Sequence, residues 1–322
     1  MNKRTHTLKN LNLFDKSITV RELVFICCII LCLFPFISPP IALTLGIVVA
    51  QFIGHPYINL NHKATQTLLQ LSVVGLGFGM NAQTAFQAGK DGFVFTLISI
   101  IGVLFFGYIL GKLLKTDKKT SFLISTGTAI CGGSAIAAIS PVIKAEEKQI
   151  SVALGTIFVL NAMAIFIFPF IGHLLRLSQH QFGLWCAIAI QDTSSVVGAA
   201  NKFGSEALEV ATAVKLTRAL WIIPLAIISS FAFKSKKTKI KVPYFIGLFV
   251  LAILLNSYFP VPNGISHAIM GLSKTGLTLT LFLIGAGLSK EVLGGVGLKP
   301  FMQGVFLWII IAIPSLLAIM FL

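Results

Sequence analysis

Residues 119–144 read KTSFLISTGTAICGGSAIAAISPVIK, an apolar run that is broken near its centre by Cys131-Gly132-Gly133-Ser134. A second broken run covers residues 182–204 and has Gln191-Asp192-Thr193-Ser194-Ser195 near its centre. In hydrocarbon every backbone N–H and C=O group needs an internal partner, so opened backbone is tolerated only where protein buries it or where it lines a cavity. Two such interruptions in one apolar chain predict a membrane fold with a site at half depth.

Composition supports the membrane class. Of the 322 residues, 56% are hydrophobic and only 11% are charged, and the mean hydropathy is +0.92. A soluble domain carries charge on about a quarter of its residues, whereas runs of about 20 apolar residues can each cross a bilayer. We predict an all-α membrane protein with about nine transmembrane helices plus the two broken or re-entrant segments, or with eleven spans. The nine expected spans are 21–37, 40–53, 63–80, 93–113, 149–173, 206–233, 243–259, 266–288 and 301–321.

The positive charge of the chain has a topological explanation. The formal net charge is +15, and most Lys and Arg residues lie in short polar gaps between apolar runs. Cytoplasmic loops collect Lys and Arg, so we expect a multi-pass protein of the cell membrane with a cytoplasmic N-terminus, surrounded by lipid and not bound to nucleic acid. Residues 1–20 are expected to form a cytoplasmic segment and residues 21–322 a single transmembrane domain. No cleavage pattern follows the first apolar run, which we interpret as a retained helix.

Internal echoes favour hairpins over full spans for the broken segments. Segment 67–93 resembles 275–301 at an offset of about 208, with glycines at matching places, and the two broken segments resemble each other at an offset of about 60. If each broken segment is a hairpin, the members of both pairs have opposite orientations. Inverted repeats are common in secondary transporters, so we predict that architecture. The matching glycines are expected to permit close packing or bending.

Two cations lie near the middle of an apolar stretch. Lys215 and Arg218 are three residues apart in 206–233, on one helical face. Burying a cation at that depth costs on the order of 3 kcal/mol on insertion scales, so both should face a polar cavity or a partner. They could hold a small anion, since Arg binds oxyanions with two parallel hydrogen bonds. The alternative is a structural ion pair with Asp192, or a Lys215 side chain that reaches outward to the interface.

Asp192 is the only acid near an apolar midpoint. It could couple transport to H⁺, because a carboxylate in a cavity of low dielectric constant can bind and release a proton. With the hydroxyl groups that follow it, Asp192 could instead supply oxygen ligands for Na⁺. The remaining alternative is that it serves only as the partner of Arg218.

The first break and a neighbouring amide complete the predicted site. Glycines let the backbone open and approach a ligand, and free N–H groups at the start of a following half-helix, 135–143, would favour an anion. Asn161 is either a link between helices or a substrate contact. The predicted substrate-binding residues are Lys215, Arg218, Cys131, Gly132, Gly133, Ser134, Asn161, Thr193 and Ser194, and the predicted coupling-ion residues are Asp192 and Ser195.

Three stretches together resemble one bacterial family. Residues 127–138, 192–197 and 214–218 with Leu220, Trp221 and Pro224 are similar to signatures of the YeiH-type inner-membrane proteins, described as sulfate exporters. The resemblance covers most of the chain from about residue 20 and implies an inverted-repeat fold with a mobile core. It leaves the substrate open, because export of sulfate is itself an inference for that family. Gln191 stands where the resemblance leads us to expect His, which weakens any role for a protonatable His there.

These observations predict a secondary transporter of a small anion such as sulfate, sulfite or an organic anion, coupled to H⁺ or Na⁺. A monovalent cation/proton antiporter with Asp192 as its ion site is the second interpretation, and a non-transporting scaffold or sensor subunit is the third. We expect no enzymatic activity, no cofactor and no metal site, because the sequence has no metal-ligand spacing, no nucleophile with a nearby base and no P-loop. A homodimer is expected by analogy alone.

Overall fold

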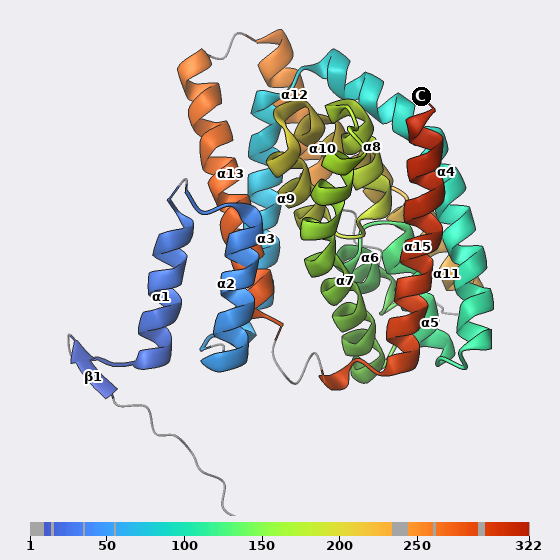
Figure 1. Cartoon of the computed structure of the whole chain (residues 1–322), viewed down its shortest axis with the longest axis horizontal. Helices are drawn as coiled ribbons and strands as arrows, with labels where there is room; N and C mark the ends of the chain where they lie inside the picture. Colours follow the sequence, from blue (N-terminus) through green and yellow to red (C-terminus); the bar gives the residue numbers. More distant parts are fainter. Residues whose placement is uncertain are drawn as a thin grey trace, which may run out of the picture.

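The computed structural model describes residues 10–13, 16–34, 36–54, 56–233, 244–259, 262–288 and 294–321, and Figure 1 shows that helices dominate them. A short antiparallel hairpin of β1 (Asn10–Leu13) and β2 (Lys16–Thr19) precedes the first helix. Of the expected segment 1–20, residues 1–9 and 14–15 lie outside the described residues. The predicted all-helical class is confirmed for the segments that follow β2.

The helices of the N-terminal half are α1 (Val20–Cys32), α2 (Pro39–Phe52), α3 (Ile58–Leu76), the 3₁₀ turn η1 (Gly77–Gly79), α4 (Ala82–Leu113), α5 (Lys118–Ala129), α6 (Gly133–Ile139) and α7 (Glu147–Leu174). Those of the C-terminal half are α8 (Gln179–Ala189), α9 (Thr193–Phe203), α10 (Ser205–Ala219), α11 (Ile222–Ala232), α12 (Tyr244–Tyr258), α13 (Asn263–Ala286) and α15 (Leu298–Met320).

Five helical stretches are long and apolar enough to cross a membrane, and α10 together with α11 forms one of them. Two further apolar helices, α2 and α12, have only 14 and 15 residues. A span needs about 20 residues at 1.5 Å per residue. The structure therefore supports a membrane protein with several spans. The five long stretches are Ala82–Leu113, Glu147–Leu174, Ser205–Ala232, Gly264–Ala286 and Leu298–Met320.

Both interrupted segments fold back on themselves. At the first, Lys119 Nζ donates to the carbonyl of Lys144 at 2.7 Å, so the start of α5 and the end of the segment lie at the same face, here called the Lys144 face. At the second, Gln179 Oε1 accepts from the backbone N–H of Glu206 at 3.0 Å, which defines the Glu206 face. Since α7 runs from one segment to the other, the two hairpins enter from opposite faces.

Two sets of helices pack around separate apolar cores. The larger core surrounds the hairpins and α7 and α10, and the smaller one joins α1, α2 and α13. In Figure 1 these sets lie on the two sides of the molecule. Close crossings depend on glycine: a Cβ at Gly285 would overlap the carbonyl of Leu43 on α2, and a Cβ at Gly77 would lie 2.9 Å from Ala252 on α12. These crossings confirm the close packing predicted for Gly77 and Gly285.

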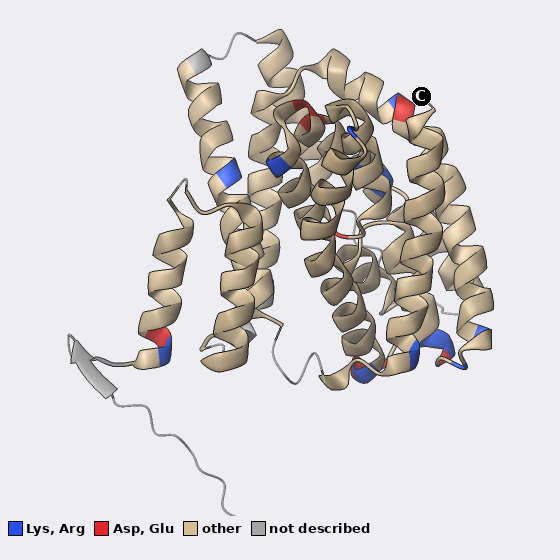
Figure 2. Ribbon diagram, viewed as in Figure 1, with Lys and Arg blue, Asp and Glu red and all other residues tan. Residues whose placement is uncertain are grey.

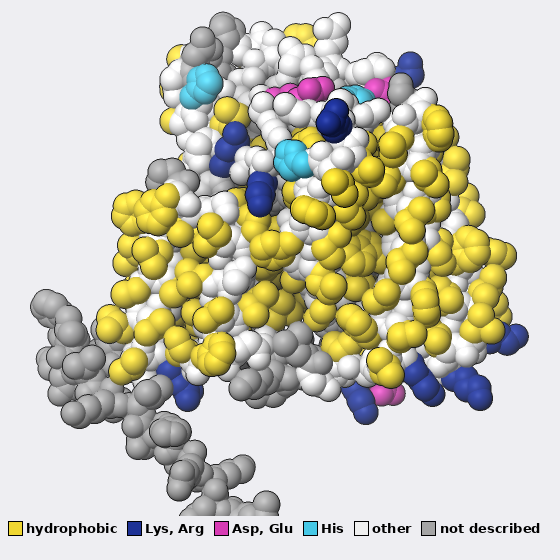
Figure 3. Space-filling model, in the orientation of Figure 1, with side chains coloured by type: hydrophobic (Ala, Val, Ile, Leu, Met, Phe, Trp, Pro, Cys, Tyr) yellow, Lys and Arg dark blue, Asp and Glu magenta, His cyan; other side chains and the backbone are white. Residues whose placement is uncertain are grey.

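The outer surface is suited to lipid. Large apolar side chains are exposed on most of the described helices, and Figure 3 shows them covering the face in view between two more polar ends. Figure 2 shows Lys and Arg gathered at the lower end. In the described part of the chain, the Lys144 face carries the ends of α4, α5 and α7 with their exposed lysines, Lys112, Lys115, Lys118, Lys144 and Lys148.

Candidate functional site

The two breaks meet inside the protein. Helix α5 ends at Ala129 and α6 starts at Gly133, and between them Gly132 has φ 61°, a conformation that L side chains rarely adopt. A Cβ at Gly132 would lie 3.2 Å from the Cα of Asp192 in the second break. Glycine is therefore required here twice, once for its backbone angle and once for the approach of the second hairpin.

Neutral polar groups tie the breaks together. Gln191 Nε2 donates to Thr128 Oγ1 at 3.2 Å, which links the second hairpin to the first. Asn161 Oδ1, on α7, accepts from the backbone N–H groups of Gln191 and Asp192, both at 3.1 Å. Backbone N–H groups freed by the break thus find an acceptor within the protein, as burial in hydrocarbon demands. Asn161 holds the break in place from its buried position.

The two cations of α10 point at the carbonyl ends of the half-helices. Lys215 Nζ donates to the carbonyl of Ile190 at 2.6 Å and to that of Ala187 at 3.3 Å. Arg218 bridges both hairpins, since Nε donates to the carbonyl of Ala129 at 2.7 Å and one terminal nitrogen to that of Ile188 at 3.1 Å. The last carbonyls of a helix have no partner within it and form its negative end. Both side chains are 0% exposed, so each cation satisfies carbonyls that water cannot reach.

Within the described residues, neither cation forms an ion pair with Asp192 inside 4.0 Å. One terminal nitrogen of Arg218 is buried without a hydrogen-bond partner. The expected structural partner of these cations is therefore the backbone and not the acid. A direct contact between either cation and a substrate stays a prediction.

Asp192 caps the second half of its hairpin. Its carboxylate accepts from the backbone N–H of Ser194 at 3.1 Å and from the Ser194 hydroxyl. A carboxylate at this N-cap position satisfies a free N–H and favours the positive end of α9. Asp192 is 7% exposed, and it reaches a cavity.

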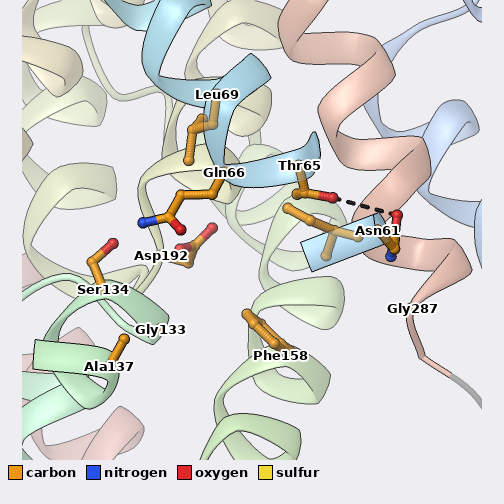
Figure 4. A pocket seen from close by; sticks show the side chains of 11 residues that line it. Asn61, Thr65, Gln66, Leu69, Gly133, Ser134, Ala137, Phe158, Asp192 and Gly287 are labelled. Atoms are coloured by element: carbon orange, nitrogen blue, oxygen red, sulfur yellow. Dashed lines mark hydrogen bonds between the residues drawn. The ribbon is translucent and has the colours of Figure 1, made fainter. Parts of the chain in front are cut away.

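That cavity lies between the hairpin tips and the helices α3 and α13. Its volume is about 260 Å³. In Figure 4 the Gln66 amide extends from α3 towards Asp192 and Ser134, while Phe158 and Ala137 lie below them. Thr65 Oγ1 donates to Asn61 Oδ1 at 3.5 Å on the same helix. The lining residues are Asn61, Thr65, Gln66, Leu69, Gly133, Ser134, Ala137, Phe158, Asp192, Ile284 and Gly287.

Three predicted site residues line this cavity, namely Gly133, Ser134 and Asp192. The other eight are buried around it without lining it: Cys131, Gly132, Asn161, Thr193, Ser194, Ser195, Lys215 and Arg218. The half-helix expected at 135–143 is the shorter α6, which ends at Ile139. A helix of two turns has a small dipole, so its N-terminus adds little to any attraction of an anion.

The polar residues of α3 were not predicted. Asn61 and Thr65 are four residues apart, on one side of the helix, and Gln66 follows, within a first half of α3 that also holds Asn59, His62 and Lys63. That spacing is the feature of the sequence from which a polar wall on α3 could have been predicted. Among the described residues, no group of three or more His, Cys, Asp or Glu side chains is positioned to hold a metal ion.

Comparisons with known proteins agree with the signatures in the sequence. A family model described as conserved hypothetical protein 698 matches residues 22–304. A UPF0324 membrane protein of Bacteroides thetaiotaomicron is 55% identical over 290 residues, which cover 89% of this chain and 87% of that protein. A UPF0324 membrane protein of Bdellovibrio bacteriovorus is 48% identical over 307 residues, 94% of each chain. No solved structure matches. The chain belongs to the UPF0324 membrane proteins, the YeiH-type family that its signatures indicated.

Proposed function

We propose that this protein is a secondary transporter that carries a small anion across the cell membrane by alternating access. The observation that carries the proposal is the cavity at the crossing of two broken hairpins, whose carbonyl ends are bonded by two fully buried cations. Intramembrane charge and opened backbone at the same depth are typical of transport sites.

The charge balance around the hairpin tips favours an anion. Lys215 and Arg218 contribute two positive charges, and the second break brings one acid, Asp192, close to Lys215, which donates to the carbonyl of Ile190 two residues before it. Part of that positive charge is offset by the carbonyl ends it contacts. In a medium of low dielectric constant the remaining field acts over several ångströms, so the cations attract an anion into the cavity without touching it.

The cavity wall supplies groups suited to an oxyanion. Ser134 offers a hydroxyl group, and Gln66 offers amide N–H groups from the facing helix, whereas the Asn61 amide already donates to the carbonyl of Leu283 at 2.9 Å. Leu69 and Phe158 leave an apolar side to the cavity. Sulfate, sulfite or a small organic anion would satisfy these contacts. Asp192, which shares the wall, would couple the movement to H⁺ or Na⁺ by exchanging its proton or by binding the cation.

Two further features support the transporter. The hairpins enter from opposite faces, as an inverted repeat of the chain requires. The exposed lysines of the Lys144 face favour a cytoplasmic location for that face and for the N-terminal side of α1. A cavity that lies on the Lys144 side of the hairpin tips would then be open to the cytoplasm.

A monovalent cation/proton antiporter is the second candidate. It is favoured by one observation: Asp192 is the charged member of the described cavity lining. In that case the cations of α10 would serve only to satisfy the carbonyl ends.

A liposome experiment separates these functions. Uptake of radiolabelled sulfate and sulfite is measured under imposed pH and Na⁺ gradients for the unchanged protein, Ser134→Ala and Asp192→Asn. We expect Ser134→Ala to raise the KM for the anion about tenfold, the value of one lost hydrogen bond to a charged ligand. Asp192→Asn, which can still cap α9, should remove the response to the gradient. Ser140→Ala is the matched control, because Ser140 is buried on the same hairpin and bonds only to the carbonyl of Ile136.

Three results are decisive. Anion uptake that Ser134→Ala weakens and Ser140→Ala does not weaken supports the anion transporter. Proton flux driven by a cation in the absence of any anion, and lost in Asp192→Asn, supports the antiporter instead. Absence of both fluxes in the unchanged protein contradicts both proposals.

A further inference from the structure

A second, smaller cavity lies at the other end of α3. Its volume is about 90 Å³. The first cavity touches α3 between Asn61 and Leu69, whereas the second touches its end at Leu76 and the following η1 turn. Ser205, at the start of α10, places the second cavity at the Glu206 face. It is lined by Leu76, Gly79, Met80, Ser205, Leu208, Glu209, Thr212, Met270 and Lys274.

The linings of the two cavities correspond through the internal repeat. Gln66 of the first cavity and Lys274 of the second are 208 positions apart, which is the offset between the echoing segments. The same offset joins Leu76 to Ile284 and Gly79 to Gly287, with the members of each pair again in opposite cavities. Three pairs at one offset relate the two cavities as equivalent places in two halves of the chain.

The packing of α3 against α13 agrees with this relation. A Cβ at Gly75 would overlap the Ser273 hydroxyl, and a Cβ at Gly276 would overlap the Ser72 hydroxyl. These two contacts have opposite order along the two helices, so α3 and α13 pack antiparallel. A rotation that exchanges two antiparallel equivalent helices also exchanges the cavities at their opposite ends.

The second cavity differs in charge. Lys274 stands where the first cavity has Gln66, and it lies midway along α13 with its side chain half-buried. A cation at such depth is costly and points to a polar pathway or a partner. Glu209 lines the same cavity, but it forms no ion pair with Lys274 within 4.0 Å in the described structure. Thr212, at the inner end, is one turn before Lys215 on α10.

We propose that this cavity is the entrance for the same small anion from the Glu206 face, and that Lys274 is its first cationic contact. The inference rests on the proposed function for the identity of the ligand. Lys274 receives the anion, and Thr212 leads towards the Lys215 side chain. Alternating access would open this cavity while it closes the one that holds Gln66.

Kinetics from each face test the role of Lys274. Proteoliposomes are sorted by the accessibility of a cysteine introduced at Lys148, and sulfate uptake is measured from either face. Lys274→Gln, which copies the residue of the first cavity, should raise the KM at least fivefold from the Glu206 face and less than twofold from the Lys144 face. Lys202→Gln is the control, since Lys202 is an exposed cation near the same face that does not line the cavity. Equal changes from both faces, or none, overturn the proposal.

Thiol labelling tests the entrance without transport. Met270→Cys lies one turn from Lys274, and Ala137→Cys lies in the first cavity. Membrane-impermeant methanethiosulfonates should reach Met270→Cys from the Glu206 face and Ala137→Cys from the Lys144 face, with the unsubstituted chain as the blank. At Met270→Cys an anionic reagent should react faster than a cationic one, and Lys274→Gln should reduce that ratio at least threefold.

The two assays separate the two proposals. If Met270→Cys reacts as expected but the unchanged protein carries no anion, the entrance stands, and both the proposed function and the anion as its ligand fail. If anion uptake is present and Met270→Cys does not react from the Glu206 face, the transporter stands and this entrance is wrong. A ratio that Lys274→Gln leaves unchanged removes Lys274 from the pathway.

Discussion

Both hairpins interrupt a helix inside the protein, but they make the turn and satisfy the freed backbone groups with different residues. In the first, the chain turns through Gly132 with a positive φ, and the freed carbonyl of Ala129 receives Arg218. In the second, the chain turns at an aspartate that caps the next helix, and its carbonyls receive both cations of α10. The first break is therefore small and uncharged, whereas the second carries its own acid.

This difference teaches how a break can be stable inside a membrane. Carbonyl ends receive cations, and N–H ends receive oxygen acceptors, here Asp192 and Asn161. The pairing follows the sign of the helix ends. Because Arg218 bonds to carbonyls of both hairpins, the breaks are also joined to each other, and α10 can carry both as one body.

The largest loss of stability is expected when the Arg218 bridge between the two hairpins is removed. Arg218→Met leaves the carbonyls of Ala129 and Ile188 buried without their donor, which costs about 3 kcal/mol when two hydrogen bonds to a charged group are lost. We expect a much lower thermal midpoint in detergent, measured by intrinsic fluorescence and by size-exclusion chromatography after heating. Arg218→Lys keeps the positive charge but loses the forked guanidinium that bonds to two carbonyls. Its thermal midpoint should therefore lie between those of Arg218→Met and the unchanged protein. A midpoint for Arg218→Met equal to that of the unchanged protein would show that the bridge is not structural.

A smaller effect is expected at the first break alone. Gly132→Ala forces a side chain into a positive-φ conformation and towards Asp192 Cα at 3.2 Å, which costs about 1–3 kcal/mol. Gly133→Ala is the matched control, because its Cβ would make van der Waals contacts with the side chains of Phe158 at 3.4 Å and Leu154 at 3.6 Å and meet no backbone that close. The same thermal measurement should rank Gly132→Ala clearly below Gly133→Ala. Equal stability of the two variants would contradict the conformational argument.

Much of the hairpin region could be predicted from sequence. Opened backbone in an apolar run has a strong local signal, and buried cations must have partners, so the breaks and the importance of Lys215 and Arg218 followed from residue types alone. The partners themselves did not follow. They are backbone carbonyls, which every residue has, and no pattern of side chains reveals which of them will be left free at a buried helix end.

The facing wall of the cavity shows a different limit. Asn61, Thr65 and Gln66 face the hairpins across the cavity only because α3 packs against α13 and α13 packs against α9. Such contacts join residues far apart in the chain. The glycines of the repeat include one pair that the sequence predicted correctly and one that it did not. Gly77 and Gly285 serve close packing, as predicted, while Gly79 and Gly287 line cavities.

The smallest effect is expected from Gln191→Met, one of two substitutions that break the neutral tie between the hairpins, and the difference between the two is informative. In Gln191→Met the hydrogen bond to Thr128 is lost, but so is Gln191 Oε1, which is buried without a partner, so the net cost should be below about 1 kcal/mol. In Thr128→Val the Gln191 amide remains buried and loses its acceptor, which should cost about 1–3 kcal/mol. The thermal midpoint of Thr128→Val should therefore fall further than that of Gln191→Met, although each variant removes the same bond. If the midpoint of Gln191→Met falls further than that of Thr128→Val, the hydrogen bond between Gln191 and Thr128 itself holds the second break against the first. The satisfaction of buried polar groups would then not be the deciding factor.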